Sequence, residues 1–274
     1  MLLPWLDVPG AGQALARWSD RTGLDLVRLG TVAPAEVVRA TEVAQPLLTA
    51  VALLSGRTLL DGADPEAVCG HSVGELSALA LAGVVPDDEA MALAAGRGRL
   101  MAQAAAATPT CMAAVLGGSV DEKTLAKAGL ELATVNVAGH VVVGGPVEAL
   151  DAWTAPVGAR VRRLDVAGAF HTTAMAPAVA GFAALVAALT PQDARCDVVA
   201  NADGAVLRDG AVLLQRLVGQ LTRPVRFDLC LAAFTSTTAV ELAPAGVLGP
   251  LLKRGRPDLA LAALRTPADL LVSV

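Results

Sequence analysis

The sequence lacks the features that mark several classes of protein. Tyrosine is absent, and only 3 Trp and 4 Phe occur among 274 residues. Lysine accounts for only three of the 21 basic residues, and the formal net charge is −5. A general nucleic-acid-binding protein would carry a strongly basic surface, so the composition argues against that class. Because 54% of the residues are hydrophobic and 17% charged, the chain is also too apolar to be disordered.

Cysteine and the N-terminus offer no metal, redox or secretion signal. The four cysteines lie far apart without a Cys-x-x-Cys spacing, which is typical of buried thiols in a reducing compartment. No basic region followed by an apolar run opens the chain. Two stretches without charged residues, Leu100–Val120 and Val166–Gln192, are interrupted by glycine, proline and polar residues, which favours core segments over membrane spans. We therefore expect a cytoplasmic protein that does not contact a membrane.

Residues 110–167 show the alternation of a ferredoxin-like unit. The expected elements are a strand at Cys111–Leu116, a helix at Val120–Ala128, strands at Leu132–Val137 and Val141–Val143, a helix at Pro146–Thr154 and a strand at Ala159–Val166. This order, β-α-β-β-α-β, is that of the ferredoxin-like fold. Helix- and strand-forming segments flank it on both sides. We therefore expect an α/β protein in which residues 1–109 and 168–274 form the larger subdomain and residues 110–167 an inserted one.

The sequence Gly70-His71-Ser72-Val73-Gly74 matches the pattern G-x-S-x-G. A short apolar run precedes it and a helix-forming segment follows, which is the context of a nucleophile elbow. In such an elbow the serine Oγ is exposed, and the backbone N–H of the next residue, Val73, can stabilise an oxyanion. A glycine-rich turn with a helix-capping serine is the alternative.

A serine nucleophile needs a base, and the chain has only three histidines. His71 adjoins Ser72 in a tight turn and would point elsewhere. His140 falls in a predicted hairpin and is expected to be exposed. His171 follows a strand-like run and precedes a helix, which makes it the best candidate. About 100 residues follow His171, whereas the histidine of an ordinary α/β-hydrolase esterase comes late in the chain.

Two arginines, Arg97 and Arg99, lie in an otherwise apolar helical segment. An arginine on such a helix can simply extend its guanidinium to solvent. It can also clamp a carboxylate, because the two groups match in geometry.

The run Gly70–Ala78 resembles the GHSxGE signature of malonyl-CoA:acyl carrier protein transacylases and of the acyltransferase domains of polyketide and fatty-acid synthases. Further segments agree with that family in order and spacing, so that the resemblance covers nearly the whole chain. They are Gly96–Met101, Asn136, Gly168–His171, Arg223–Phe227 and Glu241–Pro244.

The resemblance implies an α/β-hydrolase-like large subdomain with a parallel sheet and a ferredoxin-like small one. It also implies a ping-pong reaction in which His171 deprotonates Ser72 and the serine takes the malonyl group from malonyl-CoA. The phosphopantetheine thiol of acyl carrier protein then accepts the group. The family orients its histidine with a backbone carbonyl, and no cofactor or metal is expected.

The same resemblance assigns the substrate-binding residues. It places the carboxylate-binding arginine at Arg97 and not at Arg99. It adds His71, Val73, Asn136 and Phe170 as substrate-binding candidates. A preference for malonyl over methylmalonyl depends only on Phe170 and on the resemblance.

The N-terminus departs from the family pattern. Family members begin with an apolar strand that leads into P-G-Q-G-x-Q, whose glutamine helps to form the oxyanion hole. The segment Pro9–Gln13 is only superficially similar, has no preceding strand and is expected to begin a helix at Gln13–Trp18. Whether Gln13 substitutes is left open. Loss of one oxyanion donor typically costs about 10²–10³ in rate.

Two alternatives therefore remain beside the transacylase. One is a serine thioesterase or editing hydrolase on the same scaffold. The other is a weakened or non-enzymatic copy that lacks the oxyanion loop. The sequence favours the transacylase, because a carboxylate clamp at Arg97 has no obvious use in a general hydrolase.

Overall fold

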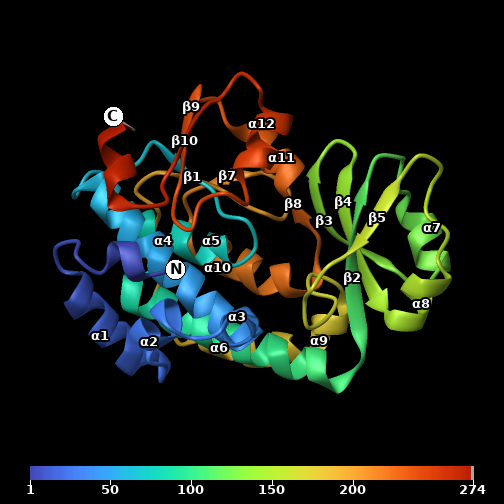
Figure 1. Cartoon of the computed structure of the whole chain (residues 1–274), viewed down its shortest axis with the longest axis horizontal. Coiled ribbons are helices and arrows are strands. Elements are labelled where there is room, and N and C mark those ends of the chain that lie inside the picture. The colour runs from blue at the N-terminus through green and yellow to red at the C-terminus, as the bar shows by residue number, and fades with distance from the viewer. Residues whose placement is uncertain (273–274) are drawn as a thin grey trace.

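A helical body and a five-stranded sheet lie side by side in the structure, a computed structural model that describes residues 1–272 (Figure 1). The helices are α1 (Ala11–Thr22), α2 (Leu26–Thr31), α3 (Ala35–Arg39), α4 (Thr41–Leu60), α5 (Gly74–Leu81), α6 (Asp87–Ala107), α7 (Glu122–Lys127), α8 (Val147–Ala152), α9 (Ala176–Ala187), α10 (Gly210–Gly219), α11 (Phe227–Ala233) and α12 (Gly249–Gly255). The strands are β1 (Ala67–Val68), β2 (Thr110–Leu116), β3 (Glu131–Val137), β4 (His140–Pro146), β5 (Arg160–Arg163), β6 (Asp197–Val199), β7 (Val206–Leu207), β8 (Val225–Arg226), β9 (Thr238–Glu241) and β10 (Ala260–Ala263).

Helices α4 and α6 form the centre of the helical body. The first turn of α6 carries Asp87, Asp88 and Glu89 after Pro86, so acidic side chains face the positive end of the helix dipole, as the sequence predicts. Helix α6 packs so closely on α4 that a Cβ at Gly98 would lie 2.9 Å from the Thr41 carbonyl oxygen. Close packing of this kind requires glycine at position 98.

Helix α4 is long and apolar enough to cross a membrane by length and composition. However, 61% of its most apolar stretch is buried inside the fold, where α1, α5 and α6 contact it. It begins at Thr41, so that Pro46 lies inside the helix rather than in its first turn. The burial identifies α4 as a core helix of this structure.

The five-stranded sheet has the order β5-β2-β4-β3-β8. Its first four strands pair antiparallel in the order of a ferredoxin-like sheet, while β8, from the later part of the chain, adds to β3 in parallel. One face packs on α7 and α8 through Leu125 and Leu150. The other face packs on Ala169 and Phe170, which places the segment before His171 against the sheet. The predicted bounds of the inserted subdomain, 110–167, stay a prediction.

The parallel strands of the larger part occur in two separate groups rather than in one sheet. Strand β1 pairs with β6 in parallel, and β6 pairs with β7 antiparallel. Strands β9 and β10 pair with each other in parallel. The α/β fold class is as predicted, and the split between the two groups is a feature that the sequence did not indicate.

The N-terminal part of the described chain is helical. Residues Leu3–Trp5 form a 3-10 turn, and α1 begins at Ala11, two residues before the expected helix start at Gln13. No strand precedes β1 within the described residues 1–272. Gln13 is exposed on α1.

Candidate active site

The turn between β1 and α5 holds Ser72 in a strained conformation. Its φ is +54°, in the left-handed region that few non-glycine residues adopt. The turn is tight, since a Cβ at Gly70 would lie 2.0 Å from the backbone carbon of Gly74. The Ser72 N–H donates to Oδ1 of Asn201 at 2.8 Å, which fixes the turn from the side of β6. This is the geometry that the G-x-S-x-G pattern predicts.

Ser72 and His171 lie in direct contact although 99 residues separate them. Ser72 Oγ is 2.6 Å from His171 Nε2, and His171 Nδ1 is 2.8 Å from the backbone oxygen of Gln220. A carbonyl oxygen only accepts, so Nδ1 carries the proton and Nε2 presents its lone pair to the serine hydroxyl. The imidazole is therefore oriented as a base.

Burial keeps this imidazole neutral. His171 is 4% exposed, and burial, together with the nearby positive charge of Arg97, lowers its pKa to about 3. At neutral pH the ring therefore holds its Nε2 lone pair free. It can accept the Ser72 proton when the serine oxygen forms a new bond.

Arg97 is a buried cation beside the serine. It is 1% exposed, and burial lowers its pKa to about 10, so it stays protonated at neutral pH. Nη1 donates to Gln45 Oε1 at 2.7 Å, and Nη2 donates to Gln220 Oε1 at 2.8 Å and to Ser72 Oγ at 3.4 Å. Its Nε has no partner among the described residues. In contrast, Arg99 is exposed.

The partners of Arg97 are all neutral, two amides and the Ser72 hydroxyl, which leaves its charge without a contacting carboxylate in the described structure. A buried charge is stable only when it is paired or well hydrogen-bonded. Glu75 acts on this charge only without contact, and an anion close to Ser72 Oγ would provide a directly contacting negative charge. The arrangement therefore favours an acyl group that carries its own carboxylate.

A buried carboxylate, Glu75, connects the other parts of the cluster. Its Oε1 accepts from the N–H of Asn201 at 2.8 Å, and its Oε2 accepts from Nε2 of Gln220 at 2.6 Å. Burial raises the pKa of Glu75 to about 7. Glu75 therefore fixes the two residues that hold Ser72 and His171.

Sequence reasoning assigned no role to Glu75, Asn201, Gln220 or Gln45. Glu75 had a usable signal, because it is the final residue of the GHSxGE pattern and the single acidic residue in the helix that follows Ser72. Gln220 acts through its backbone oxygen as well as its side chain, and nothing in a sequence marks such a role.

His71 points away from Ser72, as expected. Its Nε2 lies 2.9 Å from Oδ1 of Asn136 on β3, and its ring packs edge-on against Phe227 at 5.2 Å between centroids. Burial lowers the pKa of His71. The contact with Asn136 joins the elbow to the five-stranded sheet.

Val73 precedes α5, and its N–H has no hydrogen-bond partner within residues 1–272. It is free to donate to an oxyanion formed next to Ser72.

Phe170 is half-buried beside His171. His140 is half-buried rather than exposed, and burial lowers its pKa, with the charge of Arg254 as a second cause.

Comparison with known proteins agrees with this geometry. The family model described as acyl transferase domain matches residues 14–258. The chain belongs to this acyl transferase family. The malonyl CoA-acyl carrier protein transacylase of Mycobacterium tuberculosis is 46% identical over 282 residues, covering 98% of this chain and 93% of the relative.

Solved structures resemble this acyl transferase over almost its whole length. The crystal structure of MCAT from Mycobacterium tuberculosis matches with a TM-score of 0.93 at 46% identity, covering 98% of this chain and 93% of that one. A type II PKS acyl-carrier protein in complex with its malonyl-transacylase provides another match, with a TM-score of 0.89 and 29% identity, covering 100% of this chain and 94% of that one.

In this acyl transferase the fold brings Ser72, His171 and Arg97 into one cluster. Of the other substrate-binding candidates, His71 and Asn136 contact each other at the elbow. Val73 follows Ser72 in the sequence, and Phe170 precedes His171. Gln13 makes no hydrogen bond to the cluster. The roles of all these residues stay predictions.

Proposed function

We propose that this acyl transferase moves a malonyl group from malonyl-CoA to the phosphopantetheine thiol of acyl carrier protein, through an ester on Ser72. The observation that carries the proposal is the contact of Ser72 Oγ with a neutral His171 at 2.6 Å, beside the buried cation Arg97. Ser72 is the nucleophile of the proposed reaction, and His171 is its base. The cation supplies a reason to choose a dicarboxylic acyl group.

In the first half-reaction Ser72 Oγ attacks the thioester carbonyl while His171 Nε2 takes the hydroxyl proton. The tetrahedral oxyanion lies next to the free N–H of Val73. The carbon–sulfur bond then breaks, and the proton on His171 passes to the departing CoA thiolate. A malonyl ester of Ser72 remains, and His171 is neutral again.

In the second half-reaction the carrier thiol loses its proton to His171 and attacks the ester carbonyl. The serine oxygen leaves and recovers that proton from His171. The M. tuberculosis relative and the carrier-protein complex support this acceptor, since their names specify acyl carrier protein.

Arg97 selects the acyl group. Its guanidinium is buried and 3.4 Å from Ser72 Oγ, within reach of the free carboxylate of a malonyl ester. An acetyl group offers no carboxylate and would leave the buried charge unpaired. We also propose that Phe170, His71 and Asn136 border the acyl and pantetheine positions.

The proposed reaction uses only side chains and backbone groups, so the proposal includes no resident cofactor or metal. A cytoplasmic location is part of the proposal. Its support is that all four cysteines are free thiols, as in proteins of a reducing compartment.

The proposal is tested by measuring the fate of the malonyl group with and without acyl carrier protein as the acceptor. The protein is mixed with malonyl-CoA and holo acyl carrier protein, and malonyl carrier and free malonate are measured by mass spectrometry. We expect malonyl carrier as the main product and none with Ser72→Ala. Release of malonate at the same rate without the carrier protein would instead identify a thioesterase and overturn the proposal.

A further inference from the structure

Two side-chain amides hold the guanidinium of Arg97 through their oxygens. Gln45 Oε1 accepts from Nη1 at 2.7 Å, and Gln220 Oε1 accepts from Nη2 at 2.8 Å. An amide presents an oxygen on one side and an NH₂ group on the other, and a half-turn exchanges them. Because Arg97 can only donate, a turned amide would set NH₂ against N–H in a buried site. The orientation of the two amides therefore decides where the guanidinium lies.

A second acceptor lies behind each amide and fixes its orientation. Glu75 Oε2 accepts from Gln220 Nε2 at 2.6 Å, and the Met101 sulfur accepts from Gln45 Nε2 at 3.4 Å. All of these side chains are buried. An ionised carboxylate only accepts, and a thioether is a weak acceptor. Both NH₂ groups therefore stay turned away from the guanidinium of Arg97.

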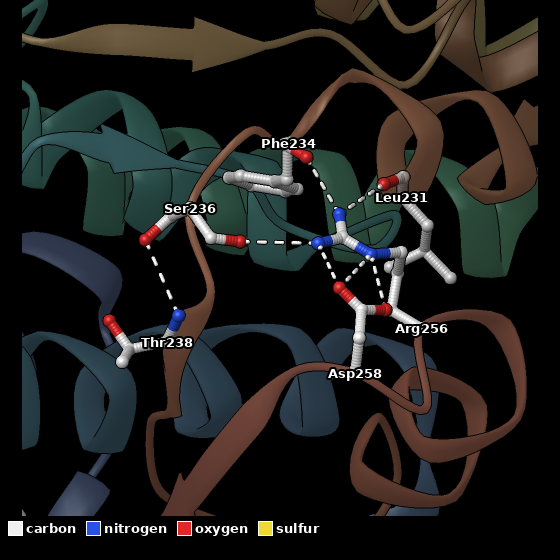
Figure 2. Close-up of polar contacts among 6 residues, drawn as sticks. All are labelled: Leu231, Phe234, Ser236, Thr238, Arg256 and Asp258. Atoms are coloured by element: carbon white, nitrogen blue, oxygen red, sulfur yellow. Dashed lines mark hydrogen bonds and ion pairs between the residues drawn. The ribbon is translucent and has the colours of Figure 1, made fainter.

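Arg256 shows how the same chain holds an arginine outside the cluster (Figure 2). Its guanidinium donates to the backbone oxygens of Phe234 and Ser236 and pairs with Asp258 at 2.8 Å. In contrast, Arg97 is held only by side chains and contacts no carboxylate within residues 1–272. Its position therefore depends on the two amides and on the acceptors behind them.

We propose that Glu75 is a positioning residue that holds Arg97 through the Gln220 amide and so sets the preference for an acyl group with a carboxylate. Met101 does the same through Gln45. The inference rests on the proposed transfer reaction, in which Arg97 binds the malonyl carboxylate. Since a guanidinium binds a carboxylate in a defined geometry, a displaced Arg97 loses malonyl binding and leaves acetyl transfer less affected.

Glu75→Gln tests this role at nearly constant shape. The buried backbone N–H of Asn201 donates to Glu75 Oε1 at 2.8 Å, so the new amide must keep its oxygen at that position. Its NH₂ group then faces Gln220 Nε2, donor against donor. The Gln220 amide must turn or move, and either change removes the oxygen from Arg97 Nη2.

The measurement is the ratio of the Ser72 acylation rates with malonyl-CoA and with acetyl-CoA, followed by intact mass. We expect this ratio to fall at least about tenfold in Glu75→Gln, because a hydrogen bond to a charged group is lost. Asp258→Asn is the matched control, since it also turns a carboxylate that helps to hold an arginine into an amide. It should leave the ratio unchanged.

Two results in folded Glu75→Gln would overturn the proposal. One is an equal loss of both rates, which indicates a structural role without an effect on acyl selection. The other is an increased ratio, which is expected if Glu75 only repels the malonyl carboxylate.

The pH dependence of the ratio is a second readout. Burial raises the pKa of Glu75 to about 7, and its proton must lie on Oε2, because Oε1 accepts from a backbone N–H. Protonation therefore sets an O–H against Gln220 Nε2, as the amide does in Glu75→Gln. We expect the native ratio to fall between about pH 8 and about pH 6 and the variant ratio to stay low and constant. An equal fall in both proteins would assign the titration to another group and overturn the role of Glu75.

Neighbouring groups do not titrate in this range. The charged and titratable groups that interact with Glu75 are Arg97 of α6, Arg216 of α10 and the Cys69 thiol. An arginine keeps its charge at these pH values. A hydrogen bond with Cys230 raises the pKa of Cys69, so the thiol stays neutral. The ratio also cancels effects on the nucleophile and its base, because both substrates use them.

Met101→Leu is a second variant that decides the matter if circular dichroism shows that Glu75→Gln does not fold. Leucine keeps the volume and removes the sulfur acceptor, so the Gln45 amide is free to turn. We expect the ratio to fall about threefold. Met91→Leu, at another buried methionine of α6, is the control and should leave the ratio unchanged.

Failure of the inference and failure of the proposed function give different results. A native protein that takes neither acyl group would refute the transfer reaction and the inference with it. A native protein that prefers malonyl-CoA, with the same preference in both positioning variants, would refute only the positioning role.

Discussion

Gln220 couples the base to the cation at the scale of single residues. Its backbone oxygen accepts from His171, and its side-chain oxygen accepts from Arg97. A carboxylate that binds Arg97 is thus linked to the imidazole that drives the reaction by a path of three hydrogen bonds, through Arg97 and Gln220. The same residue holds Glu75, so the cluster is connected from the elbow to the catalytic base. Such a network holds its members in one arrangement because they satisfy most of one another's polar atoms, Arg97 Nε being without a partner among the described residues.

Replacing Arg97 should change acyl selection more than folding. Arg97→Ala removes the partner of the malonyl carboxylate, and an unpaired buried charge costs about 3 kcal/mol, or about 100-fold. We expect the preference for malonyl-CoA over acetyl-CoA, measured as the ratio of Ser72 acylation rates, to fall by about that factor. Arg99→Ala is the matched control, since Arg99 is exposed on the same helix. An unchanged ratio in Arg97→Ala would show that another group selects the acyl chain.

The depressed pKa of His171 gives a pH prediction. A group whose pKa is lower in the folded state than in the unfolded state adds stability above its unfolded pKa, and that stability is lost as the pH falls. For His171 the loss begins near the ordinary value of 6.5 and continues toward its pKa of about 3. The chain has three histidines, so NMR can follow each ring. We expect His171, assigned with His171→Gln, to stay neutral from pH 8 to 5. Titration of His171 near 6.5 would contradict this account.

At the scale of elements, the two glycines of the elbow, Gly70 and Gly74, have different structural roles. Gly70 lies where any Cβ would overlap the backbone of Gly74, whereas a Cβ at Gly74 would meet no atom within 4 Å. Gly74 is also the first residue of α5, a position where alanine is a better helix former. The pattern G-x-S-x-G therefore combines one glycine that the turn requires and one that it tolerates.

This difference can be measured by a pair of substitutions. Gly70→Ala should lower the free energy of unfolding by at least about 2 kcal/mol, because the elbow must open to admit the methyl group. Gly74→Ala should stay within about 0.5 kcal/mol of the native protein. Urea unfolding checks both, and Ser72 acylation reports whether the elbow keeps its shape. Equal losses in the two variants would show that the steric argument is wrong.

The longest elements were predictable from sequence, whereas several of the shortest were missed. Helix α6 is predictable because its acidic first turn after Pro86 and its apolar body are local signals. Strands β7 and β8 have two residues each; pairing with the distant β3 defines β8, and pairing with the nearby β6 defines β7. Helices α2 and α3, of six and five residues, were also missed, since they depend on packing against α4.

At the scale of the whole molecule, the fold brings together the residues of the cluster from segments that lie far apart in the sequence. The elbow follows β1, His171 lies on the segment packed on the five-stranded sheet, and Gln220 follows α10 (Figure 1). Motifs could mark Ser72, His171 and Arg97, because their chemistry is tied to residue type. The roles of Asn201 and Gln220 were not predicted, because they depend on where the fold places the Asn201 side-chain amide and the Gln220 backbone oxygen.

The most direct measurement is the intact mass of the protein after exposure to malonyl-CoA and, separately, to acetyl-CoA. The account predicts one malonyl adduct that maps to Ser72, is absent in Ser72→Ala, and has no acetyl counterpart. An unmodified Ser72, an adduct on another residue, or equal labelling by acetyl-CoA would contradict the claim that Ser72 and Arg97 together select and carry the malonyl group.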